Sequence, residues 1–305
     1  MGKINKKDFL TLKDYDRKTI EYLLDLAADI KINPSKYSKV LEGKNIALLF
    51  DKKSTRTRLS FEVGISQMGG NAIYLDSVNL QLSRGETYGD TAKIFSGYLD
   101  AVIIRTFDHS TVEIFAEEGS IPVINGLTDA YHPCQILSDL FTIKEAGLLG
   151  PGLKFTYMGD SNNVTNSLII GFLKLGLGLT IGSPVEYAPG QDILEYAESI
   201  AGSKVFLVAD PVKAVKDANI VYTDVWISQG DPESSQKIKN LAGYQINSKL
   251  LKNAGKDVTI MHCLPAHRGE EITSEVLDGP GSIVIKQAEN RLYAQKALLN
   301  YIFES

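Results

Sequence analysis

Short apolar runs recur along this chain, and each is followed by a segment long enough to form a helix. The runs in the first half cover residues 46–50, 72–75, 101–105 and 122–125. Those in the second half cover residues 155–158, 179–182, 205–208, 220–223, 258–261 and 283–285. Such alternation is typical of a mostly parallel sheet with helices on both faces. The sequence therefore predicts a doubly wound α/β protein.

A glycine-rich break divides this alternation into two halves. The segment 147–152 contains three glycines and a proline, a composition that interrupts regular structure. At about 150 residues for a typical domain, a chain of 305 residues is expected to form two. We predict one domain over residues 1–146 and a second over 147–286, with a closing helix at 287–305 that packs back on the first.

The composition narrows the range of functions. The net charge of −5 argues against a general nucleic-acid-binding protein, which would be basic. Two cysteines provide no disulfide framework and indicate a reducing compartment. The N-terminus has no apolar core of signal-peptide length, and no run approaches the ~18 apolar residues of a membrane span. We therefore expect a cytoplasmic protein with neither a membrane nor a nucleic-acid partner.

The turn after the first apolar run carries an unusual set of polar groups. Residues 51–58 read Asp-Lys-Lys-Ser-Thr-Arg-Thr-Arg and lead into a helical pattern. The first turn of a helix presents unpaired N–H groups and the positive end of its dipole, which together bind anions. Capping needs one hydroxyl, whereas this turn supplies Ser54, Thr55 and Thr57 beside Arg56 and Arg58. We predict a phosphate or carboxylate site; the alternative is a well-capped helix with solvated arginines.

Other polar residues follow the predicted strands at the edge where parallel α/β sheets bind ligands. Arg105 ends a buried run, where a guanidinium without a partner is costly, so it is expected to face an anion or a nearby acid. His132 precedes Pro133, which favours an extended backbone, and with Gln135 it is a candidate donor to a developing oxyanion. Further polar clusters occupy residues 159–163, 224–230 and 262–267.

The pair His262 and Cys263 leaves two chemistries to weigh. A thiolate nucleophile is possible but needs a partnered base, which the sequence does not identify. A zinc site is disfavoured, because the four histidines and two cysteines show no paired ligand spacing. The chain also lacks the Gly-x-x-x-x-Gly-Lys-Ser/Thr loop of many ATPases. We therefore expect no cofactor and no metal.

Six motifs, taken in order, give the chain a resemblance to a known family. They are Ser-Thr-Arg-Thr-Arg at 54–58, Gln-Leu-Ser-Arg-Gly-Glu at 81–86, His-Pro-Cys-Gln at 132–135, Gly-Asp-Ser-Asn-Asn at 159–163, Asp-Val-Trp-Ile-Ser at 224–228 and His-Cys-Leu-Pro at 262–265. Together they resemble the aspartate/ornithine carbamoyltransferases, and the last motif resembles the ornithine branch. The resemblance extends from the first helix to residues 289–293, so it covers nearly the whole chain.

The resemblance implies that the first domain binds carbamoyl phosphate and the second binds L-ornithine. The residues implied for carbamoyl phosphate are Ser54, Thr55, Arg56, Thr57, Gln81, Arg105, His132, Gln135, Cys263, Leu264 and Arg291. Those implied for ornithine are Asn163, Asp224, Ser228 and Gln229, and those implied as catalytic are Arg105, His132 and Cys263. Gln81 would reach the site of a neighbouring subunit, so a homotrimer or a multiple of trimers is implied.

The implied reaction transfers the carbamoyl group to the side-chain amine of ornithine and gives L-citrulline and phosphate, within arginine metabolism. The amine must lose a proton before it attacks, because its reference pKa is near ~10.4. Thr57, Arg105 and His132 would stabilise the tetrahedral oxyanion, and phosphate would leave toward Arg56. No cofactor or metal is required, and the loop around 226–236 is expected to act as a lid.

One departure from the ornithine branch leaves another substrate open. Where that branch usually has Ser-Met-Gly, this chain has Ser228-Gln229-Gly230. An amide side chain at position 229 could favour another amine, such as putrescine or an acylated ornithine. A rival of a different class is a non-catalytic binding protein that keeps the fold. Loss of Arg56, His132 or Cys263 would have favoured that rival, and all three are present.

Overall fold

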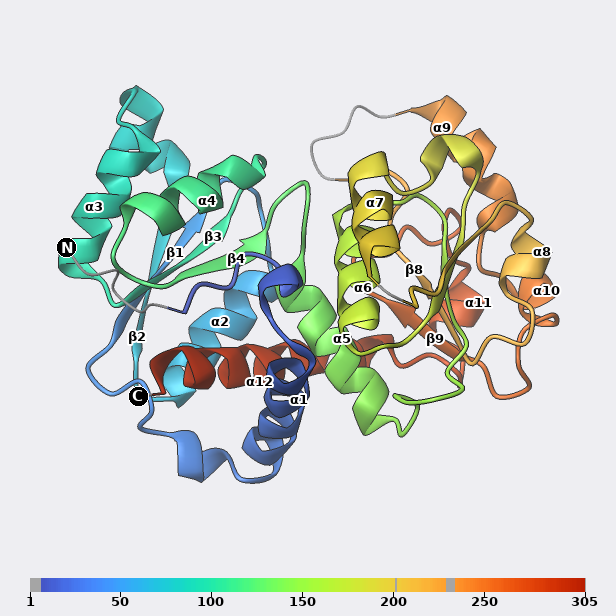
Figure 1. The fold of residues 1–305 in the computed structure, drawn as a ribbon, viewed down its shortest axis with the longest axis horizontal. Helices are drawn as coiled ribbons and strands as arrows, with labels where there is room; N and C mark the ends of the chain where they lie inside the picture. The colour runs from blue at the N-terminus through green and yellow to red at the C-terminus, as the bar shows by residue number, and fades with distance from the viewer. Residues whose placement is uncertain (1–6, 201, 229–233, 305) are drawn as a thin grey trace. The chain divides into compact units, whose positions relative to one another are not determined.

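The computed structural model describes residues 7–200, 202–228 and 234–304 (Figure 1). The chain divides into two compact units: unit 1 comprises Met1–Phe141 with Asn290–Ser305, and unit 2 comprises Thr142–Glu289. The divisions fall inside two helices, α5 at Pro133–Glu145 and α12 at Val284–Phe303. The glycine-rich segment 147–152 follows the end of α5.

Unit 1 contains a four-stranded sheet in the order β2-β1-β3-β4, and every neighbouring pair is parallel. Its strands are β1 at Asn45–Phe50, β2 at Asn71–Asp76, β3 at Ala101–Arg105 and β4 at Val123–Leu127. The four strands expected in the first half are therefore confirmed. The chain leaves β1 to one side for β2 and then crosses to the other side for β3. In parallel α/β sheets such a reversal opens a crevice at the carboxyl ends of the two strands, here β1 and β3.

The helices of unit 1 cover this sheet. They are α1 at Arg17–Ile32, α2 at Arg56–Gln67, α3 at Tyr88–Tyr98 and α4 at His109–Glu118, with short helices η1 at Leu12–Asp14, η2 at Pro34–Tyr37, η3 at Ser77–Asn79 and η4 at Gln81–Arg84. Asp16 caps α1, because its Oδ1 accepts a hydrogen bond from the backbone N of Thr19 at 2.8 Å. The C-terminal part of α12 is tied to α2 by Lys296, whose Nζ donates to Gln67 Oε1 at 3.2 Å.

Unit 2 contains a five-stranded sheet in the order β7-β6-β5-β8-β9, again with every neighbouring pair parallel. The strands are β5 at Phe155–Met158, β6 at Leu179–Gly182, β7 at Val205–Val208, β8 at Ile220–Thr223 and β9 at Thr259–His262. Five of the six strands expected in the second half are thus confirmed. Here the strand order reverses between β5 and β8, which places the corresponding crevice at their carboxyl ends.

The remaining helices of unit 2 connect these strands. They are α6 at Asn163–Lys174, α7 at Gln191–Ser199, α8 at Pro211–Ala214, α9 at Ser235–Leu241, α10 at Ser248–Leu251 and α11 at Ser274–Leu277, with short helices η5 at Val185–Tyr187 and η6 at Ala242–Tyr244. None of the described helices is both long and apolar enough to cross a lipid bilayer.

The tenth expected strand, at 283–285, is wrong. A single bridge joins Ser282 to Ile260 of β9, and α12 then begins at Val284. Ile285 is 74% exposed, so its side chain is not part of a buried sheet. A run of three apolar residues fits the start of a helix as well as a strand, and here the helical periodicity that follows extends back to include it.

Gly159 lets the carboxyl end of β5 pass directly against Trp226. Its φ of 118° is rare for residues with a side chain, and a Cβ there would lie 2.9 Å from Trp226 Nε1. Trp226 is 1% exposed and cannot move into solvent.

We expect Gly159→Ala to lower the free energy of unfolding of the protein by about 1–3 kcal/mol, measured by urea denaturation.

Gly243→Ala is the matched control for this measurement. Gly243 is exposed in η6, and a Cβ added there meets nothing within 4 Å. The unfolding free energy of the Gly243→Ala variant is expected to stay within about 0.5 kcal/mol of the parent value. Equal effects of the two substitutions would contradict the packing role of Gly159.

Candidate active site

The turn between β1 and α2 presents the groups of the predicted anion site. Helix α2 begins at Arg56, and Ser54 Oγ accepts a hydrogen bond from the backbone N of Thr57 at 3.2 Å. Ser54 therefore does cap the helix, as the alternative interpretation required. Capping does not use the other two hydroxyls: Thr55 is exposed and makes no capping bond, and Thr57 is buried.

The Thr57 hydroxyl belongs to a buried network centred on Arg291. Arg291 is 2% exposed; its Nη2 donates to Thr57 Oγ1 at 3.2 Å and its Nη1 donates to Gln135 Oε1. The amide of Gln135 in turn donates to Asp139 Oδ1 at 2.9 Å. Residues from α2, α5 and α12 are thus held together, and three of the residues predicted for one site do meet.

His132 lies where the positive charges of unit 1 act together. It is buried, and this burial holds the pKa of its imidazole well below the usual value. The charges of Arg291, Arg105 and Arg56 lower the pKa of His132 further. The imidazole is therefore neutral at physiological pH and sits within the field of three guanidinium groups, an environment suited to an anionic ligand.

Two side-chain bridges, which the sequence did not reveal, fix the loops around this site. Asp51 accepts a hydrogen bond from the hydroxyl of Thr106, directly after Arg105. Lys52 is buried, donates to the carboxylate of Asp129 and lies 4.3 Å from the ring centroid of Phe107. The ends of β1, β3 and β4 are thereby linked, which orders the anion site before any ligand arrives.

Gln81 is separate from this network. It opens the short helix η4, which precedes α3, and its side chain is exposed. Its predicted role concerns a neighbouring subunit, and an exposed position is compatible with that role.

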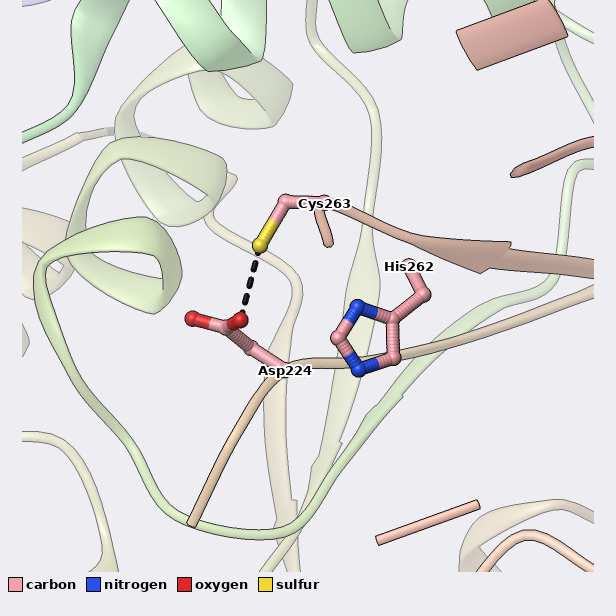
Figure 2. A group of neighbouring side chains, drawn as sticks. All are labelled: Asp224, His262 and Cys263. Carbon is pink, nitrogen blue, oxygen red and sulfur yellow. Dashed lines mark hydrogen bonds between the residues drawn. The ribbon is translucent and has the colours of Figure 1, made fainter. Parts of the chain in front are cut away.

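In unit 2 two of the predicted residues meet, Cys263 and Asp224, and Asp224 follows β8 and is buried. Its Oδ1 accepts a hydrogen bond from Cys263 Sγ at 2.7 Å, the contact drawn in Figure 2. Its Oδ2 accepts from Asn162 Nδ2 at 2.8 Å. Asn162 also caps α6 by accepting from the backbone N of Val164 at 2.9 Å. The structure therefore adds Asn162, a residue that was not predicted, beside Asn163.

A partly buried ion pair supports the loop after β5. Lys237, near the start of α9, donates from Nζ to Asp160 Oδ2 at 2.8 Å. Tyr157 donates its hydroxyl to the backbone oxygen of Asp160 at 2.6 Å, and burial raises the pKa of this phenol, so it remains a donor. These bonds fix the loop that carries Asn162 and Asn163.

The other predicted residues of unit 2 lie after β8 and β9. Cys263 and Leu264 directly follow β9 and are half-buried. Ser228 is half-buried after β8, whereas Gln229 lies outside the described residues. The expected lid at 226–236 falls partly outside them too, and its first residue, Trp226, is a core side chain.

Asp224, His262 and Cys263, which lie at the ends of β8 and β9, form one of the groups of described residues that could be considered for a metal. Ligand atoms of Asp224, His262 and Cys263 lie within 4.8 Å of one another (Figure 2). Both ring nitrogens of His262 are engaged, however: Nε2 with Glu271 Oε1 at 3.0 Å, and Nδ1 with the backbone N of Leu264 at 2.9 Å. With both ring nitrogens occupied, His262 is not available as a zinc ligand beside Asp224 and Cys263.

Comparison with known proteins gives full-length matches. Residues 7–145 match the family model "Aspartate/ornithine carbamoyltransferase, carbamoyl-P binding domain", and residues 151–302 match "Aspartate/ornithine carbamoyltransferase, Asp/Orn binding domain". The chain is 51% identical to ornithine carbamoyltransferase of Bacillus subtilis over 300 residues, covering 97% of this chain and 93% of that protein. For the enzyme of Oceanobacillus iheyensis the identity is 50%, with 96% and 93% covered.

Solved structures agree with these sequence matches. Ornithine carbamoyltransferase from Pyrococcus furiosus has a TM-score of 0.91 at 46% identity, covering 98% of this chain and 97% of that one. The anabolic ornithine carbamoyltransferase from Campylobacter jejuni has a TM-score of 0.91 at 41% identity, covering 97% and 98%.

The lowered pKa of His132 predicts a pH dependence of stability. Above the unfolded-state pKa of about 6.5, the imidazole is neutral in both states and has no effect. Below it, the unfolded chain binds a proton that the folded protein resists, so stability falls with falling pH by at most about 1.4 kcal/mol per unit. Urea denaturation between pH 8 and 5 should show this loss in the parent protein.

The variant His132→Gln isolates this contribution. It removes the titrating group, so the variant should not show this loss. The unfolding free energy of the parent should therefore fall relative to that of the variant as the pH falls below about 6.5. A constant difference across this range would show that the folded protein does not resist protonation of His132.

Proposed function

We propose a reaction for this chain, which belongs to the aspartate/ornithine carbamoyltransferase family: transfer of the carbamoyl group from carbamoyl phosphate to the side-chain amine of L-ornithine. The products are L-citrulline and phosphate, and the reaction is part of arginine metabolism. The observation that carries the proposal is the buried Arg291, which bonds Thr57 at the start of α2 and Gln135 near the start of α5, and whose charge acts with those of Arg105 and Arg56 on the buried His132. The ornithine carbamoyltransferases similar over nearly their full length identify the acceptor.

Carbamoyl phosphate is proposed to bind to unit 1 through its phosphate. The N-terminus of α2 and Arg56 supply the positive end of a helix dipole and a guanidinium. Ser54 and Thr57 accept hydrogen bonds from protein donors, so each keeps its own hydroxyl hydrogen to donate to one oxygen of carbamoyl phosphate. Arg291 donates a hydrogen bond to the Thr57 hydroxyl and is itself bonded to Gln135, so these two residues help to hold Thr57 in place.

The carbamoyl carbon then reacts with the neutral amine of ornithine. A C–N bond forms, the C–O bond to phosphate breaks, and the proton lost by the amine is balanced in the products by the released phosphate, which leaves as hydrogen phosphate. The oxyanion of the tetrahedral intermediate is proposed to be stabilised by Arg105, His132 and the Thr57 hydroxyl. Removal of one such donor typically costs about a hundred- to a thousandfold in rate. Phosphate leaves toward Arg56 and the helix N-terminus.

Ornithine is proposed to bind to unit 2 through groups at the ends of β5, β8 and β9. Asn163, Asp224 and Ser228 would bind its α-amino and α-carboxylate ends, and Cys263 with Leu264 would lie near its side-chain amine. The Cys263–Asp224 bond supports this assignment, because it places the thiol and the carboxylate in one cluster.

Two features of the setting are also proposed. The two cysteines of the chain, Cys134 and Cys263, are not joined in a disulfide, which supports a reducing compartment and hence the cytoplasm. The assembly is proposed to be a trimer or a multiple of trimers, in which Gln81 completes the carbamoyl phosphate site of a neighbour. Exposed apolar side chains on α2 and α3 support an interface there, namely Leu59, Val63, Ile94 and Tyr98.

A panel of amines tests the proposed substrate. With carbamoyl phosphate as donor, turnover should be highest with L-ornithine, and putrescine, N-acetylornithine and aspartate should each react at least about a hundredfold more slowly by kcat/KM. Formation of the carbamoylated amine and of phosphate, measured together, checks the stoichiometry. Preference for putrescine or the acylated amine would transfer the proposal to that substrate.

Subunit complementation tests the role of Gln81. Arg56→Gln and Gln81→Ala should each lower kcat/KM strongly as separate proteins, about a hundred- to a thousandfold for Arg56→Gln. Refolding the two variants together should restore activity, because a site can take its arginine from one subunit and its glutamine from the next. In an equal mixture about a quarter of the sites are intact. No recovery in a mixed trimer would mean that Gln81 acts within its own subunit or not at all.

A further inference from the structure

Strand β7 forms an outer edge of the unit 2 sheet. It ends the strand order β7-β6-β5-β8-β9, so one side pairs with β6 and no described strand pairs with the other. Its central side chains lie on opposite faces of the sheet and both are exposed, Phe206 at 55% and Leu207 at 47%. Edge strands are usually protected by a charged residue or a proline. The four residues of β7, Val-Phe-Leu-Val, include neither.

Two other edge strands are covered by the protein itself. Along β4, the backbone of Phe9 donates to the oxygen of Val123 and accepts from the N–H of Asn125, both at 2.8 Å. Along β9, Ile260 donates to the backbone oxygen of residue 281 at 2.9 Å and accepts from the N–H of residue 283 at 3.0 Å. Among the described residues no such bridge lies along β7. Its apolar edge can therefore accept a strand from a second molecule.

The direction of the backbone groups of β7 limits how such a strand can pair. The oxygen of Lys204 accepts from the N–H of Leu179 at 3.0 Å, so the backbone groups of Lys204 face β6. These groups alternate in direction along a strand, so those of Phe206 and Val208 also face β6, and those of Leu207 face outward. Hydrogen-bonded antiparallel pairs form between residues that both face outward. A twofold axis at Leu207 meets this condition, because Leu207 then pairs with its own copy.

The side chains are complementary in the same register. With Leu207 on the axis, Phe206 of one copy lies opposite Val208 of the other, an aromatic and β-branched pair of the kind that stabilises sheets. Lys204 lies opposite Asp210 at both ends, and both residues are exposed. In this register these are non-hydrogen-bonded pairs, whose side chains approach most closely. The backbone of Asp210 is still extended, with φ −84° and ψ 113°, so the pairing can reach it.

The end of the strand is ordered without a partner. Tyr244 donates its hydroxyl to the backbone oxygen of Ala209, and Asp210 Oδ1 accepts from the backbone N of Val212 at 2.9 Å. The oxygen of Ala209 keeps a second lone pair, which can accept the N–H of Val205 from the other copy. Because the edge is already fixed, pairing costs little conformational entropy.

We propose that β7 is a self-association edge: two copies of this chain pair antiparallel through residues 204–210, about a twofold axis at Leu207. The two five-stranded sheets then continue into one another. The interface is isologous, since both copies use the same patch. It involves no residue assigned to a substrate and lies in unit 2, so it depends neither on the proposed reaction nor on the proposed trimer contacts in unit 1.

Reversal of the end charges tests the register. Lys204→Asp places two carboxylates opposite each other at each end, and Asp210→Lys places two ammonium groups there. Each variant alone should raise the dissociation constant for pairing by about tenfold or more. An equal mixture should pair again, because each Lys204→Asp copy then meets opposite charges on an Asp210→Lys copy. Sedimentation equilibrium measures the three samples.

Recovery in the mixture separates charge pairing from a folding defect. Asp210 also caps α8, so Asp210→Lys removes a cap within its own chain. Mixing cannot replace that cap, and it restores only contacts between copies. A mixture that associates no better than the separate variants would contradict the pairing of Lys204 with Asp210.

A cysteine at the proposed axis gives a second readout. In Leu207→Cys the two Cα atoms would lie about 5.5 Å apart, within the range that a disulfide spans. In the matched control Val205→Cys they would be offset by four residues, about 13 Å along the strands. With oxidised glutathione, which is reduced as the bond forms, Leu207→Cys should give linked pairs about tenfold faster or more. Non-reducing gel electrophoresis measures both variants against the parent, whose two cysteines set the background.

The mass of the assembly decides the proposal. Leu207→Lys places a charge on the axis beside its own copy, so at high protein concentration the parent should have at least about twice the mass of this variant. The circular dichroism spectra of the two should match, because Leu207 is exposed. Equal masses, or equal linking of the two cysteine variants, would overturn the self-association edge and leave β7 to a strand of another protein or to solvent.

Discussion

The burial of the Arg291 guanidinium is the constraint on which the anion site of unit 1 depends. A guanidinium removed from water must be matched by acceptors, because its desolvation is otherwise far too costly. Arg291 meets this demand with Gln135 and Thr57, and Gln135 passes the connection on to Asp139. These hydrogen bonds join α12 to α2 and α5, so the buried arginine fixes the start of α2 relative to the helix that follows His132.

The topology of each sheet decides which loops supply the site residues. In unit 1 the strand order reverses between β1 and β3, which are followed by Ser54 and ended by Arg105. In unit 2 it reverses between β5 and β8, which are followed by Asn162 and Asp224. Because the strands are parallel, their carboxyl ends share one edge, and residues far apart in sequence become neighbours. The same arrangement occurs once in each sheet. It brings together hydroxyl and guanidinium groups in unit 1, and a carboxylate, an amide and a thiol in unit 2.

The fold could be predicted from the sequence because buried parallel strands are continuous apolar runs, which stand out in any context. The run at 283–285 was too short to carry that signal. The cluster at 54–57 was also visible in the sequence, because it has more adjacent hydroxyl and guanidinium groups than the capping of a helix needs. Asn162 and Lys52 lie in segments that the sequence marked, but their bonds to Asp224 and Asp129, like that of Glu271 to His262, could not be predicted, because each depends on how separate parts of the chain fold together. Their positions could not be deduced without knowing which loops meet.

The hydrogen bonds donated to Asp224 bear on the chemistry as well as on its geometry. Asp224 is bonded to Cys263, which is proposed to lie near the side-chain amine of ornithine, so the charge of Asp224 would act on that amine too. A carboxylate without such donors would raise the pKa of the amine and hold it in the charged form, which cannot attack. In this protein Cys263 and Asn162 each donate to one oxygen of Asp224, so its charge is distributed over bonds that already exist. The carboxylate can then help to orient an amino acid while exerting a weaker hold on the proton that must leave.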